Sequence, residues 1–126
     1  MKSRRVLTIN EKARARVREV LGFSLQEENW YEPGRSPQSP EDDPRHVVSL
    51  DTCRCVFSTT RAPSGQRFRH LSVSVLGRYY LSPFAFYSIA QEFGFTGWDG
   101  QNINPPKDWS IDINREKGCA VAIQRY

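Results

Sequence analysis

The chain has 126 residues, 38% hydrophobic and 25% charged, and this length and composition predict a single globular domain spanning residues 1–126. No apolar run approaches the roughly 18 residues of a membrane-spanning helix, and no apolar segment follows the basic N-terminus as in a secretory signal. We therefore expect a cytoplasmic protein with no membrane association. The three cysteines form neither a disulfide framework nor a complete metal-ligand pattern, so no cofactor is predicted.

Charge is distributed unevenly along the first half of the chain. Residues 1–22 contain seven basic and two acidic residues, whereas residues 26–51 contain seven acidic and two basic ones. The net charge of the whole chain is +4 and its pI is about 9.2, which favours an anionic partner. The acidic segment either folds back on the basic one or forms a separate surface for a partner of opposite charge.

The first element in chain order is a helix that is predicted to begin near Thr8 and to end at Gly22. Thr8 and Glu11 have the spacing of a capping box. An apolar stripe follows at helical spacing, formed by Ile9, Ala13, Val17, Val20 and Leu21.

Two pairs of basic side chains flank this stripe: Arg14 with Arg18 on one side, and Lys12 with Arg16 on the other. Such side chains either lay their stems over the edge of the core or bind an anion. We take Arg14 and Arg18 as candidate binding residues.

Residues 26–46 form the longest irregular stretch of the chain. Prolines at positions 33, 37, 40 and 44 interrupt any regular element. Loops of this length are usually functional or disordered, and we expect a flexible, proline-rich acidic loop. Trp30 and Tyr31 near its start either anchor the loop to the domain or form an exposed recognition patch, so both are candidate binding residues.

Strand signals begin at about Val47. Two β-rich runs follow, at residues 52–60 and 67–75, and the turn residues between these two runs predict a hairpin. Apolar and polar residues alternate along the second run: Leu71, Val73 and Val75 share one face, and Phe68, His70, Ser72 and Ser74 share the other. This alternation predicts a strand with one face on a core.

The second face of that strand carries an imidazole beside hydroxyl groups, so His70 is a candidate binding residue. It does not carry a complete catalytic set, because side chains two apart on a strand rarely form a good Ser–His hydrogen bond. We therefore expect that the protein is not an enzyme, while a hydrolase or nuclease that uses His70 stays open.

Basic and aromatic residues are interleaved on this strand and after it, and the candidate binding residues among them are Arg67, Arg69, Tyr79 and Tyr80. These residue types suit phosphate contact and base stacking, which makes nucleic acid a candidate partner. Arg67 and Arg69 are alternatively residues that extend past the edge of the core. Trp98 adds another candidate exposed aromatic residue of the kind that dominates protein interfaces.

A second helix is predicted to begin at Ser82, with Pro83 in its first turn, and to end at Gly94. Apolar residues alternate again at residues 109–113 and 119–123, which predicts a last pair of strands. The predicted order is α-β-β-α-β-β. We therefore expect an α+β fold with two helices and a mostly antiparallel four-stranded sheet.

Three features of the C-terminal half carry a resemblance to known proteins: the strand sequence Arg69-His70-Leu71-Ser72-Val73-Ser74, the Ser82–Pro83 helix start, and the proline-led entry into the last strands. They resemble a group of short phage- and prophage-encoded proteins of unknown function that share an R-H-L-S-[VI]-S strand, a following helix and a proline-led final strand pair. The resemblance covers residues 67–126, and no catalytic residue carries over from it.

This resemblance implies a small accessory protein of a mobile element, a class that often works by stoichiometric binding in the host-cell cytoplasm. We accordingly expect a non-enzymatic binding protein that inhibits a host defence machine handling nucleic acid, as anti-CRISPR proteins do. The expected partner is a host protein or ribonucleoprotein complex. Two alternatives stay open, namely a small basic protein that binds DNA or RNA and a small hydrolase or nuclease that uses His70.

Overall fold

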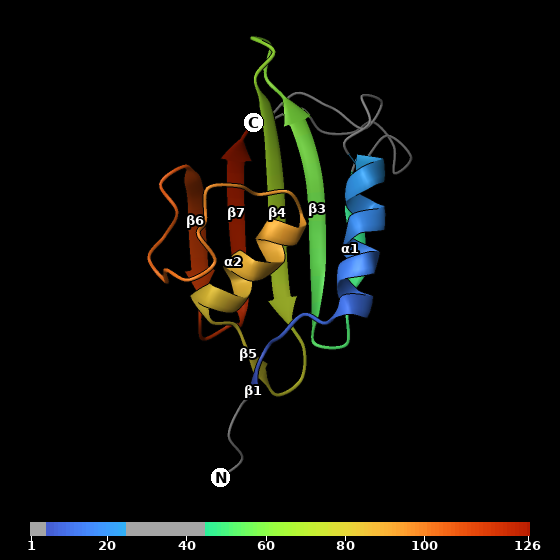
Figure 1. Ribbon diagram of the computed structural model, residues 1–126, viewed down its shortest axis with the longest axis vertical. Helices are drawn as coiled ribbons and strands as arrows, with labels where there is room; N and C mark the ends of the chain where they lie inside the picture. Colours follow the sequence, from blue (N-terminus) through green and yellow to red (C-terminus); the bar gives the residue numbers. More distant parts are fainter. Residues whose placement is uncertain (1–4, 25–44) are drawn as a thin grey trace.

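The computed structural model describes residues 5–24 and 45–126 of the chain. In these residues the elements are β1 (Arg5–Val6), α1 (Glu11–Ser24), β2 (His46–Ser49), β3 (Cys53–Arg61), β4 (Arg67–Val75), β5 (Tyr79–Tyr80), α2 (Pro83–Glu92), β6 (Trp109–Asn114) and β7 (Cys119–Arg125). One antiparallel sheet has the strand order β2-β3-β4-β7-β6, and β1 pairs with β5 in a small parallel sheet. Both helices lie over the same face of the larger sheet (Figure 1).

The predicted hairpin is confirmed as the centre of the sheet. Strands β3 and β4 pair antiparallel along their whole length, from Cys53 opposite Val75 to Arg61 opposite Arg67. Gly65 in the connecting turn has a φ of 93°, a left-handed conformation that favours glycine. The predicted last strand pair, β6 and β7, is also present and joins β4 through β7.

The sheet has five strands rather than the predicted four. The additional strand is β2, which pairs antiparallel with β3 and forms one edge. A tight turn joins these strands, closed by the Leu50 N–H, which donates to the Cys53 carbonyl oxygen at 2.8 Å. Strand β2 is short, and the turn after it lacks glycine and proline. In the sequence it therefore looks like the beginning of the β-rich run that contains β3. The β1–β5 pair was not predicted either, since two residues carry no periodicity.

Helix α1 begins later than the capping-box pattern predicted. The N-cap is Asn10 instead of Thr8, and its Oδ1 accepts a hydrogen bond from the Ala13 N–H at 2.9 Å. The helix also continues two residues beyond Gly22, which does not have the positive φ of a C-terminal glycine. The predicted apolar stripe is confirmed, because Val17 is fully buried and the other four stripe residues pack partly buried against the core.

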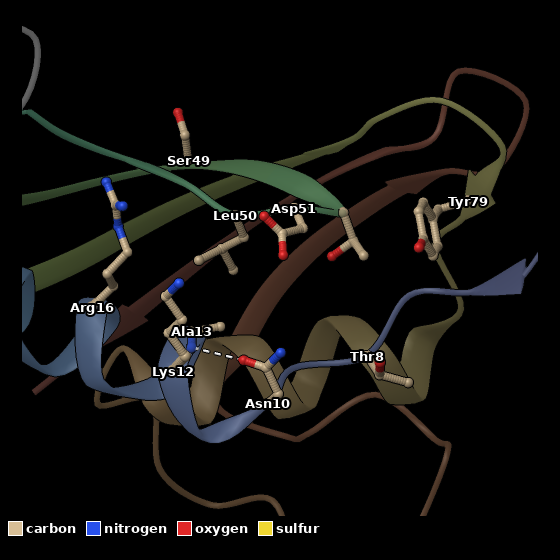
Figure 2. A pocket seen from close by; sticks show the side chains of 10 residues that line it. Thr8, Asn10, Lys12, Ala13, Arg16, Ser49, Leu50, Asp51 and Tyr79 are labelled. Carbon is tan, nitrogen blue, oxygen red and sulfur yellow. Dashed lines mark hydrogen bonds between the residues drawn. The ribbon is translucent and has the colours of Figure 1, made fainter.

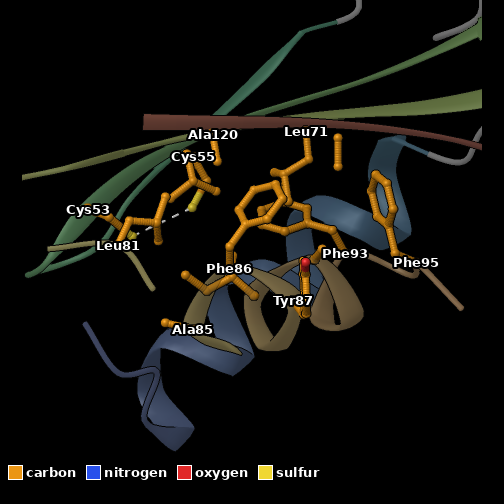
Figure 3. Close-up of a cluster of buried hydrophobic side chains, with 14 of the residues drawn as sticks. Cys53, Cys55, Leu71, Leu81, Ala85, Phe86, Tyr87, Phe93, Phe95 and Ala120 are labelled. Carbon is orange, nitrogen blue, oxygen red and sulfur yellow. Dashed lines mark hydrogen bonds between the residues drawn. The ribbon is translucent and has the colours of Figure 1, made fainter. Parts of the chain in front are cut away.

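Helix α2 begins as predicted. The Ser82 hydroxyl oxygen accepts a hydrogen bond from the Ala85 N–H at 3.1 Å, and Pro83 occupies the first turn. The helix ends before Gly94, whose φ is 89°. Its buried aromatic side chains face the sheet (Figure 3).

The described buried apolar residues form one core between the helices and the sheet. Phe57 of β3 stacks on Phe93 at the end of α2, with ring centroids 5.1 Å apart. Cys53 and Cys55 are fully buried free thiols on the same face of β3 (Figure 3), and their sulfur atoms lie 3.8 Å apart. The hydrogen bond with Cys53, together with burial, raises the pKa of the Cys55 thiol, so it stays protonated and packs as a small apolar group.

Candidate functional site

Two of the predicted binding residues, Arg14 and Arg18, pair with carboxylates of the protein itself. Arg14 Nε lies 3.4 Å from Glu92 Oε1, and Arg18 Nε lies 3.6 Å from Glu92 Oε2. Glu11 in the first turn of α1 adds contacts of 3.3 Å to Arg14 and 3.9 Å to Arg18. These ion pairs join α1 to the end of α2. The two positive charges are therefore compensated by carboxylates of the same protein.

Arg69 is placed on the core side of β4, where it is only 8% exposed. Its Nη1 donates to Gln124 Oε1 at 3.3 Å, and its Cζ lies 3.6 Å from the centre of the Tyr126 ring. Burial lowers the pKa of Arg69, and burial also raises the pKa of Tyr126 to about 12. Arg69 therefore stacks on a neutral aromatic ring at the end of the core. Arg67 lies exposed at the beginning of the same strand.

His70 is on the face of β4 that points away from both helices. Its Nε2 is hydrogen-bonded to Thr60 Oγ1 of β3 at 2.8 Å, and Thr60 is only 2% exposed. Burial lowers the pKa of His70, which favours the neutral imidazole. The ring is thus engaged with a buried hydroxyl across the hairpin, whereas no hydrogen bond joins it to the neighbouring Ser72 or Ser74 in the described structure.

Of the predicted exposed aromatic residues, Trp98 is buried. Its ring lies between Phe84 and Tyr87, at centroid distances of 5.3 and 5.8 Å, and it is 9% exposed. Its Nε1 donates to the Asn102 carbonyl oxygen at 2.6 Å, which anchors the loop after α2. Trp98 therefore contributes to packing and presents little surface to a partner.

The remaining predicted aromatic residues differ in position. Tyr79 and Tyr80 form strand β5, where Tyr80 is 37% exposed and Tyr79 is half-buried. Trp30 and Tyr31 lie outside the described residues, as does the predicted acidic loop up to position 44.

A cleft of about 310 Å³ lies between the first turns of α1 and the turn that joins β2 to β3 (Figure 2). Lys12 and Arg16 of α1 line one wall, and Asp51 and Thr52 of the turn line the other. Tyr79 of β5 closes one end. The basic flank of the helix was predicted from the sequence, whereas the turn that faces this flank was not.

Backbone hydrogen bonds fix the elements around this cleft. The Leu76 N–H donates to the Thr52 carbonyl oxygen at 2.9 Å, which ties the β2–β3 turn to the end of β4. The Leu7 N–H donates to the Tyr80 carbonyl oxygen at 3.4 Å, which holds the chain entering α1 beside β5. These bonds tie the β2–β3 turn and the chain entering α1 to neighbouring strands on both sides of the cleft.

The cleft carries two positive charges and one negative charge. Lys12 and Arg16 are both exposed, and neither forms an ion pair with any other residue in the described ranges. Asp51 is also exposed. A cleft with this balance suits a ligand that carries an anionic group together with groups that donate hydrogen bonds.

The face of the large sheet opposite the helices, which we call the helix-free face, carries a row of side chains across neighbouring strands. Strand pairing places Val47 beside Val56, Val56 beside Ser72, and Ser72 beside Val121. Val47 is 49% exposed and Val121 is 43% exposed. These two valines are therefore accessible, because neither helix covers this face of the sheet.

A shallow hollow of about 280 Å³ lies at one corner of the helix-free face. Phe68, Trp109 and Ile123 provide its apolar lining, Lys107 and Arg125 provide positive charge, and Asp108 provides one carboxylate. Arg125 pairs with Phe68 across β4 and β7, so the two residues are cross-strand neighbours.

No group of three or more His, Cys, Asp or Glu side chains is placed to hold a metal ion in residues 5–24 and 45–126. Neither of the two described helices has the length and apolar character needed to cross a membrane. The chain gives no significant match to a protein-family model, a curated protein or a solved structure. The resemblance of residues 67–126 to phage-encoded proteins therefore stays a prediction.

Proposed function

We propose that the protein acts by binding, as a phage- or mobile-element-type inhibitor of a host macromolecular machine that handles nucleic acid. Its contact surface is the helix-free face, and its partner is a protein subunit of that machine with an apolar patch. The observation that carries the proposal is the row formed by Val47, Val56 and Val121 on this face, which we call the valine row.

The valine row has the properties of an interface centre. The row from β2 to β7 spans about 14 Å, given the usual strand spacing of about 4.8 Å. Apolar side chains exposed on one face are typical of protein-binding surfaces, and in this row Ser72 lies between Val56 and Val121. Arg54 and Arg125 are exposed on the same face at the edges of the patch, and the exposed Asp112 lies beside Val121. An apolar centre with arginines at its rim is the composition found in interfaces.

The surroundings of His70 support binding over hydrolysis. A general base needs a lone pair directed at the proton it removes. His70 Nε2 is engaged with the buried Thr60 hydroxyl, so only Nδ1 is left to direct a lone pair at a substrate, and the ring is half-buried. This arrangement favours a role for His70 in joining β3 to β4.

The test is a complex of defined composition formed with a purified host machine. The tagged full chain is mixed with lysate of a bacterial host, the captured component is identified, and its nucleic-acid-directed activity is measured with and without the protein. We expect a stoichiometric complex and loss of that activity. Val121→Glu and Val47→Glu should each weaken the complex by about tenfold or more, since a carboxylate would be desolvated in the interface.

The matched control is Leu76→Glu, since Leu76 is 44% exposed in the turn after β4, outside the valine row. It should leave the complex intact. If no host component is inhibited, or if the Val121 and Leu76 variants behave alike, the proposed function is wrong.

A second candidate function is direct binding of single-stranded nucleic acid, and the hollow beside Phe68 favours it. Its adjacent aromatic ring and cations suit base stacking and phosphate contact. Fluorescence anisotropy with a labelled oligonucleotide tests this function. Binding should weaken steeply with salt, and Lys107→Ala should lower the salt slope by about one unit.

A further inference from the structure

We propose that the cleft between α1 and the β2–β3 turn binds a mononucleotide, with its phosphate held by Lys12 and Arg16. This inference does not depend on the proposed function, because the cleft shares no residue with the valine row of the helix-free face.

The opposite flank of α1 shows that two cations at this spacing can bind one carboxylate. Arg14 and Arg18 stand one helical turn apart, and each contacts a different oxygen of the Glu92 carboxylate, at 3.4 and 3.6 Å. Lys12 and Arg16 have the same spacing on the flank that lines the cleft, and in the described residues no carboxylate pairs with them. They therefore form a second basic pair of the same spacing, exposed along the cleft, that can contact an anion bound there.

Asp51 and Tyr79 indicate what the rest of the ligand contains. The Asp51 carboxylate accepts hydrogen bonds, so it suits the hydroxyl groups of a ribose, the use that acidic residues have in dinucleotide sites. The half-buried Tyr79 offers a ring against which a base can stack. A phosphate, a ribose and a base together account for the basic, acidic and aromatic lining.

The size and charge of the cleft favour a single nucleotide as its ligand. Its volume of about 310 Å³ lies at the lower end of the range for small-molecule sites. The negative charge of Asp51 opposes a second phosphate at that wall. A polyphosphate chain or a continuous nucleic-acid backbone is therefore disfavoured relative to a nucleoside monophosphate.

The proposal is tested by calorimetric titration of the full chain with AMP, GMP, CMP and UMP at low salt. We expect at least one of them to bind with a Kd below about 1 mM. Lys12→Ala and Arg16→Ala should each weaken it by about tenfold, as expected for loss of a charged hydrogen bond. The matched control is Arg18→Ala, which removes the same charge from the other flank of the same helix and should change the Kd by less than about twofold. Circular dichroism checks that each variant is folded.

Further probes separate the possible ligand classes. Asp51→Asn should weaken nucleotide binding but leave inorganic phosphate binding unchanged or stronger. The proposal is overturned if none of the four nucleotides binds, if inorganic phosphate or a nucleoside binds as tightly as the nucleotide, or if the Arg18 variant loses affinity as the Arg16 variant does. It is also overturned if a ten-residue oligodeoxythymidylate binds more tightly than every mononucleotide, because the site would then belong to a nucleic-acid surface.

Discussion

The two flanks of α1 carry similar pairs of basic residues in opposite surroundings. Arg14 and Arg18 face α2 and share the carboxylate of Glu92. Lys12 and Arg16 face a cleft and pair with no carboxylate in the described residues. Equal spacing of like charges on one helix therefore leads to ion pairs with Glu92 on one side and to no ion pair within the described residues on the other.

The difference comes from the neighbouring element rather than from the helix. Glu92 is the last residue of α2, and its position is set by packing of that helix on the sheet, for example by the stacking of Phe93 on Phe57. The β2–β3 turn that faces Lys12 presents Asp51 across the cleft instead of a carboxylate within ion-pair distance. Tertiary contacts thus decide which of two equivalent cation pairs is compensated.

The largest expected effect comes from the apolar stripe that separates the two flanks. Val17→Ala should lower the free energy of unfolding by about 2 kcal/mol, because Val17 is fully buried and the truncation leaves a cavity. Urea denaturation followed by circular dichroism measures the change. Arg16→Ala, on the exposed flank, should change stability by less than about 0.5 kcal/mol. Equal losses in both variants would show that the stripe does not anchor α1.

Removal of the N-cap should have the next largest effect. Asn10→Ala should cost about 1 kcal/mol, since the Ala13 N–H loses its acceptor at the end of the helix that carries both flanks. Thr8→Ala should cost less than half as much, because Thr8 is exposed and does not cap the helix. Thermal denaturation of both variants compares the two positions. A larger loss from Thr8→Ala would show that Thr8 caps the helix, as the capping-box pattern predicted.

Much of the fold could be predicted because its signals are local. The alternation of Leu71 with Ser72 along β4 and the Ser82–Pro83 start of α2 each specify one element within a few residues. The fifth strand could not be predicted, because the turn at Leu50 contains neither glycine nor proline. The β1–β5 pair joins distant segments through two residues each and therefore leaves no local pattern.

The site was harder to predict than the fold, because a side chain's role depends on what approaches it. Arg69 alternates in register with the core residues of β4, yet only the structure shows Tyr126 under its guanidinium. Trp98 sits among glycines and polar residues, a composition typical of an exposed loop, but it packs against Phe84. Residue type identified side chains that are able to bind a partner. In the structure, several of these side chains contact other residues of the same protein.

A smaller effect is expected when the ion pairs of Arg14 and Arg18 with Glu92 are removed. Glu92→Gln should lower stability by less than about 1 kcal/mol, since Arg14 and Arg18 are partly exposed and solvent screens both ion pairs. The loss should shrink between low salt and 1 M NaCl. Chemical denaturation at both salt concentrations measures it. A loss that does not depend on salt would mean that Glu92 acts through packing, and the comparison of the two flanks as charge clamps would fail.

The smallest expected effect concerns His70, another predicted binding residue that an internal contact engages. Burial lowers the pKa of His70 below its ordinary value of 6.5, so the unfolded chain binds the proton more readily than the folded protein. Stability from this group is present above pH 6.5 and is lost as the pH falls toward the lowered pKa. The protein should therefore lose more stability between pH 7.5 and pH 5.5 than a His70→Gln variant, in which the side chain does not titrate. Urea denaturation at pH 7.5, 6.5 and 5.5 compares the two, and the other titrating groups are common to both. Identical pH profiles would show that the folded protein and the unfolded chain bind the His70 proton equally well, so that the contact with Thr60 does not disfavour the charged imidazole.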